Sequence, residues 1–324
     1  MGEFDLIERY FKRPARRAAL GIGDDCALLQ PTAGHQLAIS SDMLVEGRHF
    51  LSTVDPARLG HKALAVNLSD LAACGAKPLA FTLALSLPRA DESWLAGFSQ
   101  GLLALADAHG CELIGGDTTQ GPLNICITIF GEVPVSDGRS QALLRARARA
   151  GDDLYVSGTV GDARLALEVF RGTVSVPADV FDAARLRLEC PTPRVALGLA
   201  LRGVASAAID VSDGLLGDLG HILKQSGVGA TVDIDMAASL VASRSSALQI
   251  PTEQWRTWAL AGGDDYELLF SAPALMRGAV AAAAQSCQTT VTRIGQIDAE
   301  QGLRLLDGQS QPARNTYISF DHFG

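Results

Sequence analysis

The apolar and polar residues of this chain recur with two different periods. Apolar residues repeat at helical spacing over residues 3–12, which predicts an amphipathic helix, and residues 92–109 predict a longer Ala- and Leu-rich helix that ends at Gly110. Strand character appears instead at residues 37–41 (LAISS) and in the alternating segment 81–87 (FTLALSL). Helices and strands are therefore expected to alternate along the first half of the chain.

Asp55 and Pro56 predict the start of another helix. Aspartate is a favoured N-cap residue, and proline fits the first helical position because the amide hydrogen that it lacks would have no partner there. This helix is expected to run to about Cys74, and Gly75 ends it. Two further strands complete a mixed α/β unit, at residues 111–115 and 124–133.

The second half of the chain repeats this alternation. Residues 134–152 are polar and basic, and we place the domain junction there, with domains at 1–137 and 138–324. The expected strands lie at 154–158, 206–210, 230–235, 266–270, 289–297 and 303–306, and the expected helices lie at 161–171, 180–189, 194–202, from 213 onward, and at 274–286. The pattern predicts the α/β (α+β) class, with two mixed α/β domains.

Composition and charge narrow the classes of function. The chain of 324 residues is 48% apolar and only 6% aromatic, so its core is expected to consist mainly of Ala, Val, Leu and Ile. A net charge of −9 argues against a general nucleic-acid-binding protein, since the one basic run is RARARA at 145–150. No apolar run reaches the length of a membrane span, so we expect no membrane partner.

The cysteines and the N-terminus indicate a compartment. The six cysteines are scattered without metal-binding spacing, and free thiols suit a reducing environment. The first residues lack the apolar stretch of a signal peptide, so we expect a cytoplasmic protein. The cysteines are Cys26, Cys74, Cys111, Cys126, Cys190 and Cys287.

Acidic residues recur beside glycines and apolar runs, where we expect strand ends and tight turns. Because Asp and Gly are ordinary turn residues, any one of these segments has a purely structural interpretation. Five such segments beside buried strands indicate a shared site more strongly than turns alone. They are GIGDD (21–25), SSD (40–42), GGDT (115–118), DVSDG (210–214) and GGDDYE (262–267).

Asp70 falls on the apolar stripe of the helix that begins at Pro56. A carboxylate on a core-facing stripe is costly unless it forms an ion pair or binds a metal. Lys62 and Lys77 are candidate partners, so an ion pair stays open beside the metal interpretation. The stripe consists of Leu59, Ala63 and Val66.

The acids favour magnesium if they converge. Two carboxylates ~4 Å apart repel by roughly 4 kcal/mol at an effective dielectric of 20, and divalent cations relieve that repulsion. Ligands that are all oxygens favour Mg²⁺ over Zn²⁺, and Mg²⁺ held by a few carboxylates is typical of sites that handle phosphates. The sequence has neither a P-loop motif nor the signatures of protein kinases.

Six segments, taken in order, resemble the thiamine-monophosphate kinase family. The resemblance implies a PurM-like fold, ATP as co-substrate, several Mg²⁺ ions and a cleft between the two domains. It also implies a homodimer formed through the N-terminal domains, which would carry metal and ATP phosphates, while the C-terminal domains contact nucleotide and substrate. The segments are GIGDDCALL (21–29), LAISSDMLVEGRHF (37–50), KALAVNLSDLAACGAKP (62–78), LIGGDTTQGPL (113–123), AIDVSDGLLGDLGHIL (208–223) and GGDDYEL (262–268), with FDHF (320–323) at the end.

The same resemblance assigns site residues. The implied metal ligands are Asp25, Ser40, Ser41, Asp42, Asp70, Asp117, Asp210 and Asp213. The implied nucleotide contacts are Gly116, Asp117, Arg145 and Ser212, and the implied contacts to thiamine phosphate are His49, Asp264 and Phe320. Some relatives carry Glu in place of Asp264, and the terminal aromatic varies; Phe320 can stack on a cationic ring but cannot donate a hydrogen bond. Taken alone, His49 and Arg145 also have ordinary structural interpretations.

The implied reaction is phosphorylation of thiamine monophosphate by ATP through direct in-line transfer. No catalytic base is assigned, because a phosphate monoester has a second pKa near 6 and is largely a dianion at neutral pH. The alternatives are another enzyme of the superfamily, such as an aminoimidazole ribonucleotide synthetase, a selenophosphate synthetase or the hydrogenase-maturation dehydratase, or a nucleotide-binding module without turnover. The dehydratase carries a C-terminal Cys, whereas this chain ends in DHFG.

Overall fold

The computed structural model describes residues 2–320 and forms two compact units. The first consists of Met1–Leu71 and Ala76–Gln141, and the second of Ala72–Gly75 and Ala142–Gly324. Each is a mixed α/β domain, which confirms the predicted fold class. The last three residues of the motif FDHF lie outside the described part of the chain.

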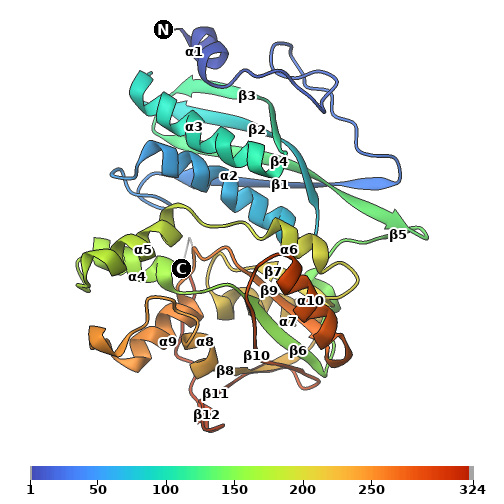
Figure 1. Cartoon of the computed structure of the whole chain (residues 1–324), viewed down its shortest axis with the longest axis vertical. Coiled ribbons are helices and arrows are strands. Elements are labelled where there is room, and N and C mark those ends of the chain that lie inside the picture. The colour runs from blue at the N-terminus through green and yellow to red at the C-terminus, as the bar shows by residue number, and fades with distance from the viewer. Residues whose placement is uncertain (1, 321–324) are drawn as a thin grey trace. The chain divides into compact units, whose positions relative to one another are not determined.

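The first unit is a sheet with the strand order β1-β4-β2-β3, in which β5 pairs with β4 (Figure 1). Only β2 and β3 run parallel; the other pairs are antiparallel. Its strands are β1 (His35–Val45), β2 (Lys77–Leu87), β3 (Glu112–Gln120), β4 (Asn124–Ser136) and β5 (Arg139–Ser140). Its helices are α1 (Glu3–Tyr10), α2 (Pro56–Ala73) and α3 (Glu92–His109).

The ends of the two long helices follow the predicted signals. Asp55 Oδ1 accepts hydrogen bonds from the amides of Ala57 and Arg58 at 2.9 and 3.2 Å, so Asp55 caps α2 as predicted. Asp91 caps α3 in the same way. Gly110 ends α3 in the left-handed conformation with φ 58°, which costs glycine little.

The two faces of this sheet differ in burial. Leu83, Ile127 and Ile129 are at most 5% exposed and point to the face that α2 and α3 cover (Figure 1). On the opposite face, Ile39 and Met43 of β1 are 62% and 53% exposed. We call this second surface the open face; it carries Leu37, Ile39, Ser41 and Met43 of β1 with Cys126 and Thr128 of β4.

Two of the acidic segments do not lie at strand ends, so this part of the prediction was wrong. Asp42 pairs with Ile127 inside β1, and Asp117 pairs with Ala84 inside β3. The neighbouring strands continue past the acids and pair with their backbones, so the strands do not stop where the side chains become polar. The acids of SSD and GGDT therefore project from the faces of the sheet.

The second unit contains a sheet of seven strands in the order β12-β11-β8-β10-β6-β9-β7. Its core includes Trp258, Leu154 and Ile209, each at most 2% exposed. The strands are β6 (Asp152–Ser157), β7 (Ala207–Asp210), β8 (Gly229–Asp233), β9 (Leu268–Pro273), β10 (Val291–Asp298), β11 (Gly302–Leu306) and β12 (Pro312–Ala313). The helices are α4 (Asp162–Phe170), α5 (Ala178–Glu189), α6 (Val195–Ala200), α7 (Leu215–Ser226), α8 (Ile234–Ala238), α9 (Thr252–Ala261) and α10 (Arg277–Ser286), with short 3₁₀ turns η1 (Arg145–Arg147), η2 (Ser246–Leu248) and η3 (Ala274–Met276).

The segment Ala72–Gly75, which ends α2, groups with the second unit. A Cβ atom on Gly198 of α6 would lie 2.0 Å from the carbonyl oxygen of Ala72, so only glycine allows this approach. The described part of the chain contains no helix with both the length and the apolar character needed to span a bilayer.

Close packing of α2 against α3 predicts a strong effect at Gly101. A Cβ atom there would lie 1.8 Å from the carbonyl oxygen of Ala57, so Gly101→Ala has to push the helices apart. We expect this substitution to lower the free energy of unfolding by about 2–3 kcal/mol in urea titrations.

Gly220→Ala is the control, because its Cβ atom in α7 would meet nothing within 4 Å. We expect it to raise stability by up to about 1 kcal/mol through helix propensity. Equal effects of the two substitutions would contradict the packing argument.

Candidate active site

Helix α2 and strand β1 bring three of the predicted site residues together on the covered face of the first sheet. The Ser40 hydroxyl donates a hydrogen bond to the Asp70 carboxylate. Asn67, which is 1% exposed, accepts a hydrogen bond from the Asp42 amide at 3.2 Å. Side chains alternate along a strand, so Ser40 and Asp42 point to the same side, toward α2. The predicted inward position of Asp70 is confirmed.

Ser41 faces the opposite side of β1. Its hydroxyl lies 3.0 Å from Thr128 Oγ1 and donates to the Ile127 carbonyl at 3.2 Å. The adjacent serines therefore present their hydroxyls on different faces of the sheet. A strand period of two residues makes this unavoidable.

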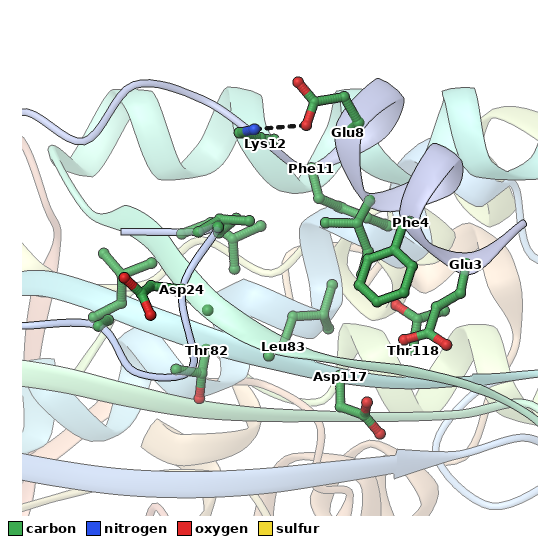
Figure 2. Close-up of a pocket in the computed structure, with 18 of the residues that line it drawn as sticks. Glu3, Phe4, Glu8, Phe11, Lys12, Asp24, Thr82, Leu83, Asp117 and Thr118 are labelled. Carbon is green, nitrogen blue, oxygen red and sulfur yellow. Dashed lines mark hydrogen bonds and ion pairs between the residues drawn. The ribbon is translucent and has the colours of Figure 1, made fainter. Parts of the chain in front are cut away.

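Asp25, Gly116 and Asp117 line one cavity of about 680 Å³ in the first unit (Figure 2). In Figure 2 Asp117 and Thr82 point to one side of the strands and Leu83 points to the other. At Gly116 (φ 148°), a Cβ atom would lie 1.9 Å from the Leu83 carbonyl oxygen, so the position requires glycine.

Helix α1 supplies one wall of this cavity, which the sequence did not assign to the site. Phe4 and Ile7 add apolar surface, and Lys12 forms an ion pair with Glu8 at 2.6 Å (Figure 2). Phe4 is 82% exposed. The sequence could not predict this, because the same helical spacing is expected of a core residue.

Asp218 organises the DVSDG turn in the second unit. Its carboxylate accepts hydrogen bonds from the amides of Ser212 and Asp213 at 3.0 and 3.1 Å. Asp210 ends β7 just before this turn and is 5% exposed. Burial, with the nearby charge of Asp213, raises the pKa of Asp218 to about 7. The sequence analysis missed Asp218; its position on the apolar side of α7 was the available signal.

Backbone hydrogen bonds bring two other predicted segments to this turn. The Asp264 amide donates to the Ser212 carbonyl at 2.8 Å, and the Phe320 amide donates to the Asp213 carbonyl at 3.1 Å. Residues expected to contact nucleotide, metal and acceptor therefore adjoin one another within the second unit. The Tyr266 amide adds a further bond, to the Val211 carbonyl at 2.8 Å.

Arg145 and His49 lie in short connecting segments. Arg145 is exposed and begins η1, which packs against α7 and β7, and its carbonyl accepts from Ser226 Oγ at 2.8 Å. His49 is half-buried after β1; its Nδ1 accepts a hydrogen bond from the Val45 amide at 3.0 Å. That bond fixes the ring and its tautomer.

The convergence of the acids around metal remains a prediction. Within residues 2–320, no group of three or more His, Cys, Asp or Glu side chains is arranged to hold a metal ion. The predicted ligands are divided between the two units, with Asp210 and Asp213 in the second. The oxygen-only donor set and the contact between Ser40 and Asp70 fit a magnesium site.

Comparison with known proteins covers nearly the whole chain. Residues 23–133 match the family model "AIR synthase related protein, N-terminal domain", and residues 149–308 match the corresponding C-terminal domain. The chain is 48% identical to the thiamine-monophosphate kinase of Salmonella typhimurium over 99% of its own length and 98% of that protein. The chain belongs to the thiamine-monophosphate kinase family.

Solved structures agree with this membership. The thiamine-monophosphate kinase of Stenotrophomonas maltophilia is 48% identical, with a TM-score of 0.82 over 92% of each chain. AaThiL complexed with AMPPCP and TMP is 28% identical, with a TM-score of 0.76 over 91% of this chain and 89% of that one. Escherichia coli HypE, a hydrogenase maturation protein, is 19% identical with a TM-score of 0.74 over 98% and 96%, a likeness of fold alone. The family recognised from the motifs is confirmed.

In this member of the thiamine-monophosphate kinase family, Asp218 is expected to make the free energy of unfolding decrease as the pH rises. Its pKa of about 7 in the folded protein exceeds the ordinary value of 3.8, so the folded state holds a proton that the unfolded chain releases. The resulting stabilisation is fully present below pH 3.8 and is lost as the pH rises through about 7.

The wild type is compared with Asp218→Asn by urea unfolding in metal-free buffer. We expect the stability difference, wild type minus variant, to fall by about 2–4 kcal/mol between pH 4 and pH 8. A difference that stays constant or grows with pH would show that Asp218 is ionised throughout.

Proposed function

We propose that this chain transfers the γ-phosphoryl group of ATP to thiamine monophosphate, giving ADP and thiamine diphosphate. The observation that carries the proposal is the full-length similarity to thiamine-monophosphate kinases, at 48% identity over 99% of the chain. AMPPCP in the AaThiL complex stands for ATP with a carbon in place of the bridging oxygen, and TMP stands for the acceptor. The adjoining segments of the second unit support the same assignment.

The metal sites are proposed to lie among the oxygen donors of both units. Ser40, Asp42 and Asp70 offer such donors on the covered face of the first sheet, and Ser41 and Asp117 offer them on the open face. Asp25, Asp210 and Asp213 complete the proposed ligand set. Bound Mg²⁺ would neutralise phosphate charge and relieve repulsion among these carboxylates. Asn67 holds the backbone at Asp42, and Asp218 holds the backbone at Asp213, so the carboxylates are oriented in advance.

The nucleotide and acceptor are proposed to meet the glycine-bearing segments. Gly116 and Asp117 border the cavity of the first unit, and glycine at position 116 lets the backbone of β3 approach Leu83 closely. Ser212 and Arg145 are proposed to complete the nucleotide contacts. For the acceptor, Asp264 offers a carboxylate to the cationic thiamine, and Phe320, 45% exposed, offers a ring face.

The chemistry requires positioning more than proton transfer. The acceptor phosphate, with a second pKa near 6, is already a nucleophile at neutral pH, so no side chain has to remove a proton. We propose direct in-line transfer, in which the chain aligns two phosphates, and we propose His49 as a contact to the acceptor. A cytoplasmic location, predicted from the sequence, belongs to the same proposal.

Asp42→Asn and Asp210→Asn are each expected to reduce kcat by at least about 100-fold, because each removes a carboxylate that the proposal assigns to metal. Circular dichroism should show an unchanged fold. Asp179→Asn, at the exposed start of α5, is the matched control and should keep full activity. The assay follows thiamine diphosphate formation with ATP and Mg²⁺, and EDTA should abolish it.

A panel of phosphate monoesters separates this function from the alternatives. Product with another acceptor but none with thiamine monophosphate would point to a different enzyme of the superfamily. ATP binding without any diphosphate product would point to a nucleotide-binding module. Full activity in either carboxylate variant would refute the metal assignment.

We propose that the open face forms the interface of a homodimer. Ile39 and Met43 are 62% and 53% exposed on a sheet face that no helix of the same unit covers, and such surfaces are rare on monomers. The paired strands β1 and β4 also place Cys126 and Thr128 on this face, so the surface continues across the sheet.

Ile39→Glu is therefore expected to yield a monomer in sedimentation velocity experiments, because it places a charge at the proposed interface. Leu275→Glu is the control, since Leu275 is 97% exposed in the second unit and should not alter the assembly. A dimer that survives Ile39→Glu, or a wild type that is monomeric, would overturn the assigned interface.

A further inference from the structure

The backbone of the segment GGDDYE (262–267) alternates between two conformations at residues 264–266. Asp264 and Tyr266 adopt left-handed φ values of 60° and 51°, which are uncommon for residues other than glycine. Their amides donate to the carbonyls of Ser212 and Val211 in the DVSDG turn. The side chains of Asp265 and Glu267 are buried, at 3% and 0% exposed. A backbone in this conformation persists only where its surroundings fix it.

Glu267 fixes the C-terminal end of the segment. It accepts hydrogen bonds from Arg194 at 2.6 Å, from Arg187 at 2.8 Å and from Ser157 Oγ at 2.6 Å. This buried ion pair with two arginines accounts fully for Glu267 as a structural residue.

Asp265 is not accounted for in this way. Its Oδ1 accepts one hydrogen bond, from the Gly161 amide at 2.8 Å, and its Oδ2 has no hydrogen-bond partner among the described residues. The side chain lies between two left-handed residues, one of which is the proposed acceptor contact Asp264. A buried carboxyl with an unsatisfied oxygen lowers stability, so a purely structural role gives no reason for its presence.

We propose that Asp265 is a positioning residue for the acceptor substrate. Its hydrogen bond to Gly161 holds Asp264 and Tyr266 in their left-handed conformations and thereby directs the Asp264 carboxylate. This inference rests on the proposed function, which assigns Asp264 to the acceptor. The hydroxyl of Tyr266, 3.4 Å from Asp264 Oδ1, lies on the same side and restricts that carboxylate further.

Burial also raises the pKa of Asp265 well above its ordinary value. Asparagine has the same shape and keeps the acceptor oxygen, whereas alanine removes it. A comparison of the two variants therefore isolates the effect of the hydrogen bond that position 265 accepts from Gly161.

The test compares Asp265→Ala with Asp265→Asn in steady-state kinetics on the full chain. For Asp265→Ala we expect KM for thiamine monophosphate to rise about tenfold, while KM for ATP changes less than about twofold. Asp265→Asn should restore KM to near the wild-type value. If the alanine variant does not fold, Asp265→Ser, whose hydroxyl is too short to reach Gly161 in the same way, replaces it with the same expectation.

Asp153→Ala is the control for a general loss of stability. Asp153 is 2% exposed and bonded to Arg277 at 2.6 Å and Arg293 at 3.0 Å, so its loss should lower the melting temperature without changing either KM. An unchanged KM for thiamine monophosphate in Asp265→Ala, or an equal change for both substrates, would overturn the inference. A wild type that does not phosphorylate thiamine monophosphate would instead overturn the proposed function.

Discussion

Two backbone hydrogen bonds, from Asp264 to Ser212 and from Tyr266 to Val211, are the constraint on which the second unit's part of the site depends. They join two loops that lie more than 50 residues apart in the sequence. These bonds form only if Asp264 and Tyr266 keep their left-handed backbone conformations, which are unfavourable for residues other than glycine. The contacts of the buried residues Asp265 and Glu267 have to offset that cost. In this domain the packing of the interior therefore also determines how the Asp264 carboxylate is oriented.

In the first unit the corresponding constraint is the strand period. Ser40 and Ser41 are neighbours in sequence, yet one reaches Asp70 under α2 and the other reaches Thr128 on the open face. Asp42 and Asp117 differ in the same way. The sheet therefore carries polar side chains on both faces, one of which α2 and α3 cover.

The sequence predicted best where local chemistry decides the structure. Asp55 is a side-chain cap with fixed geometry and was predicted as one, and the helix from 92 to 109 was predicted with the bounds that the structure shows. Helices α8 and α9 were missed because their apolar residues give only a weak periodic signal in the sequence. The strand at 266–270 was placed two residues early, since the left-handed backbone at Tyr266 is set by distant partners. The site residues came from motifs, whereas Asp218, Asp265 and the wall formed by α1 required the fold.

Helix α2 has a consequence for biosynthesis. Its last residues group with the second unit, where Gly198 of α6 closes on Ala72, so this turn has its partner only after another 120 or so residues have been synthesised. While the nascent chain emerges from the ribosome, the strands of the first domain can pair, but the end of α2 still lacks its packing partner in α6. The end of α2 is therefore fully packed only after the chain has been synthesised as far as α6.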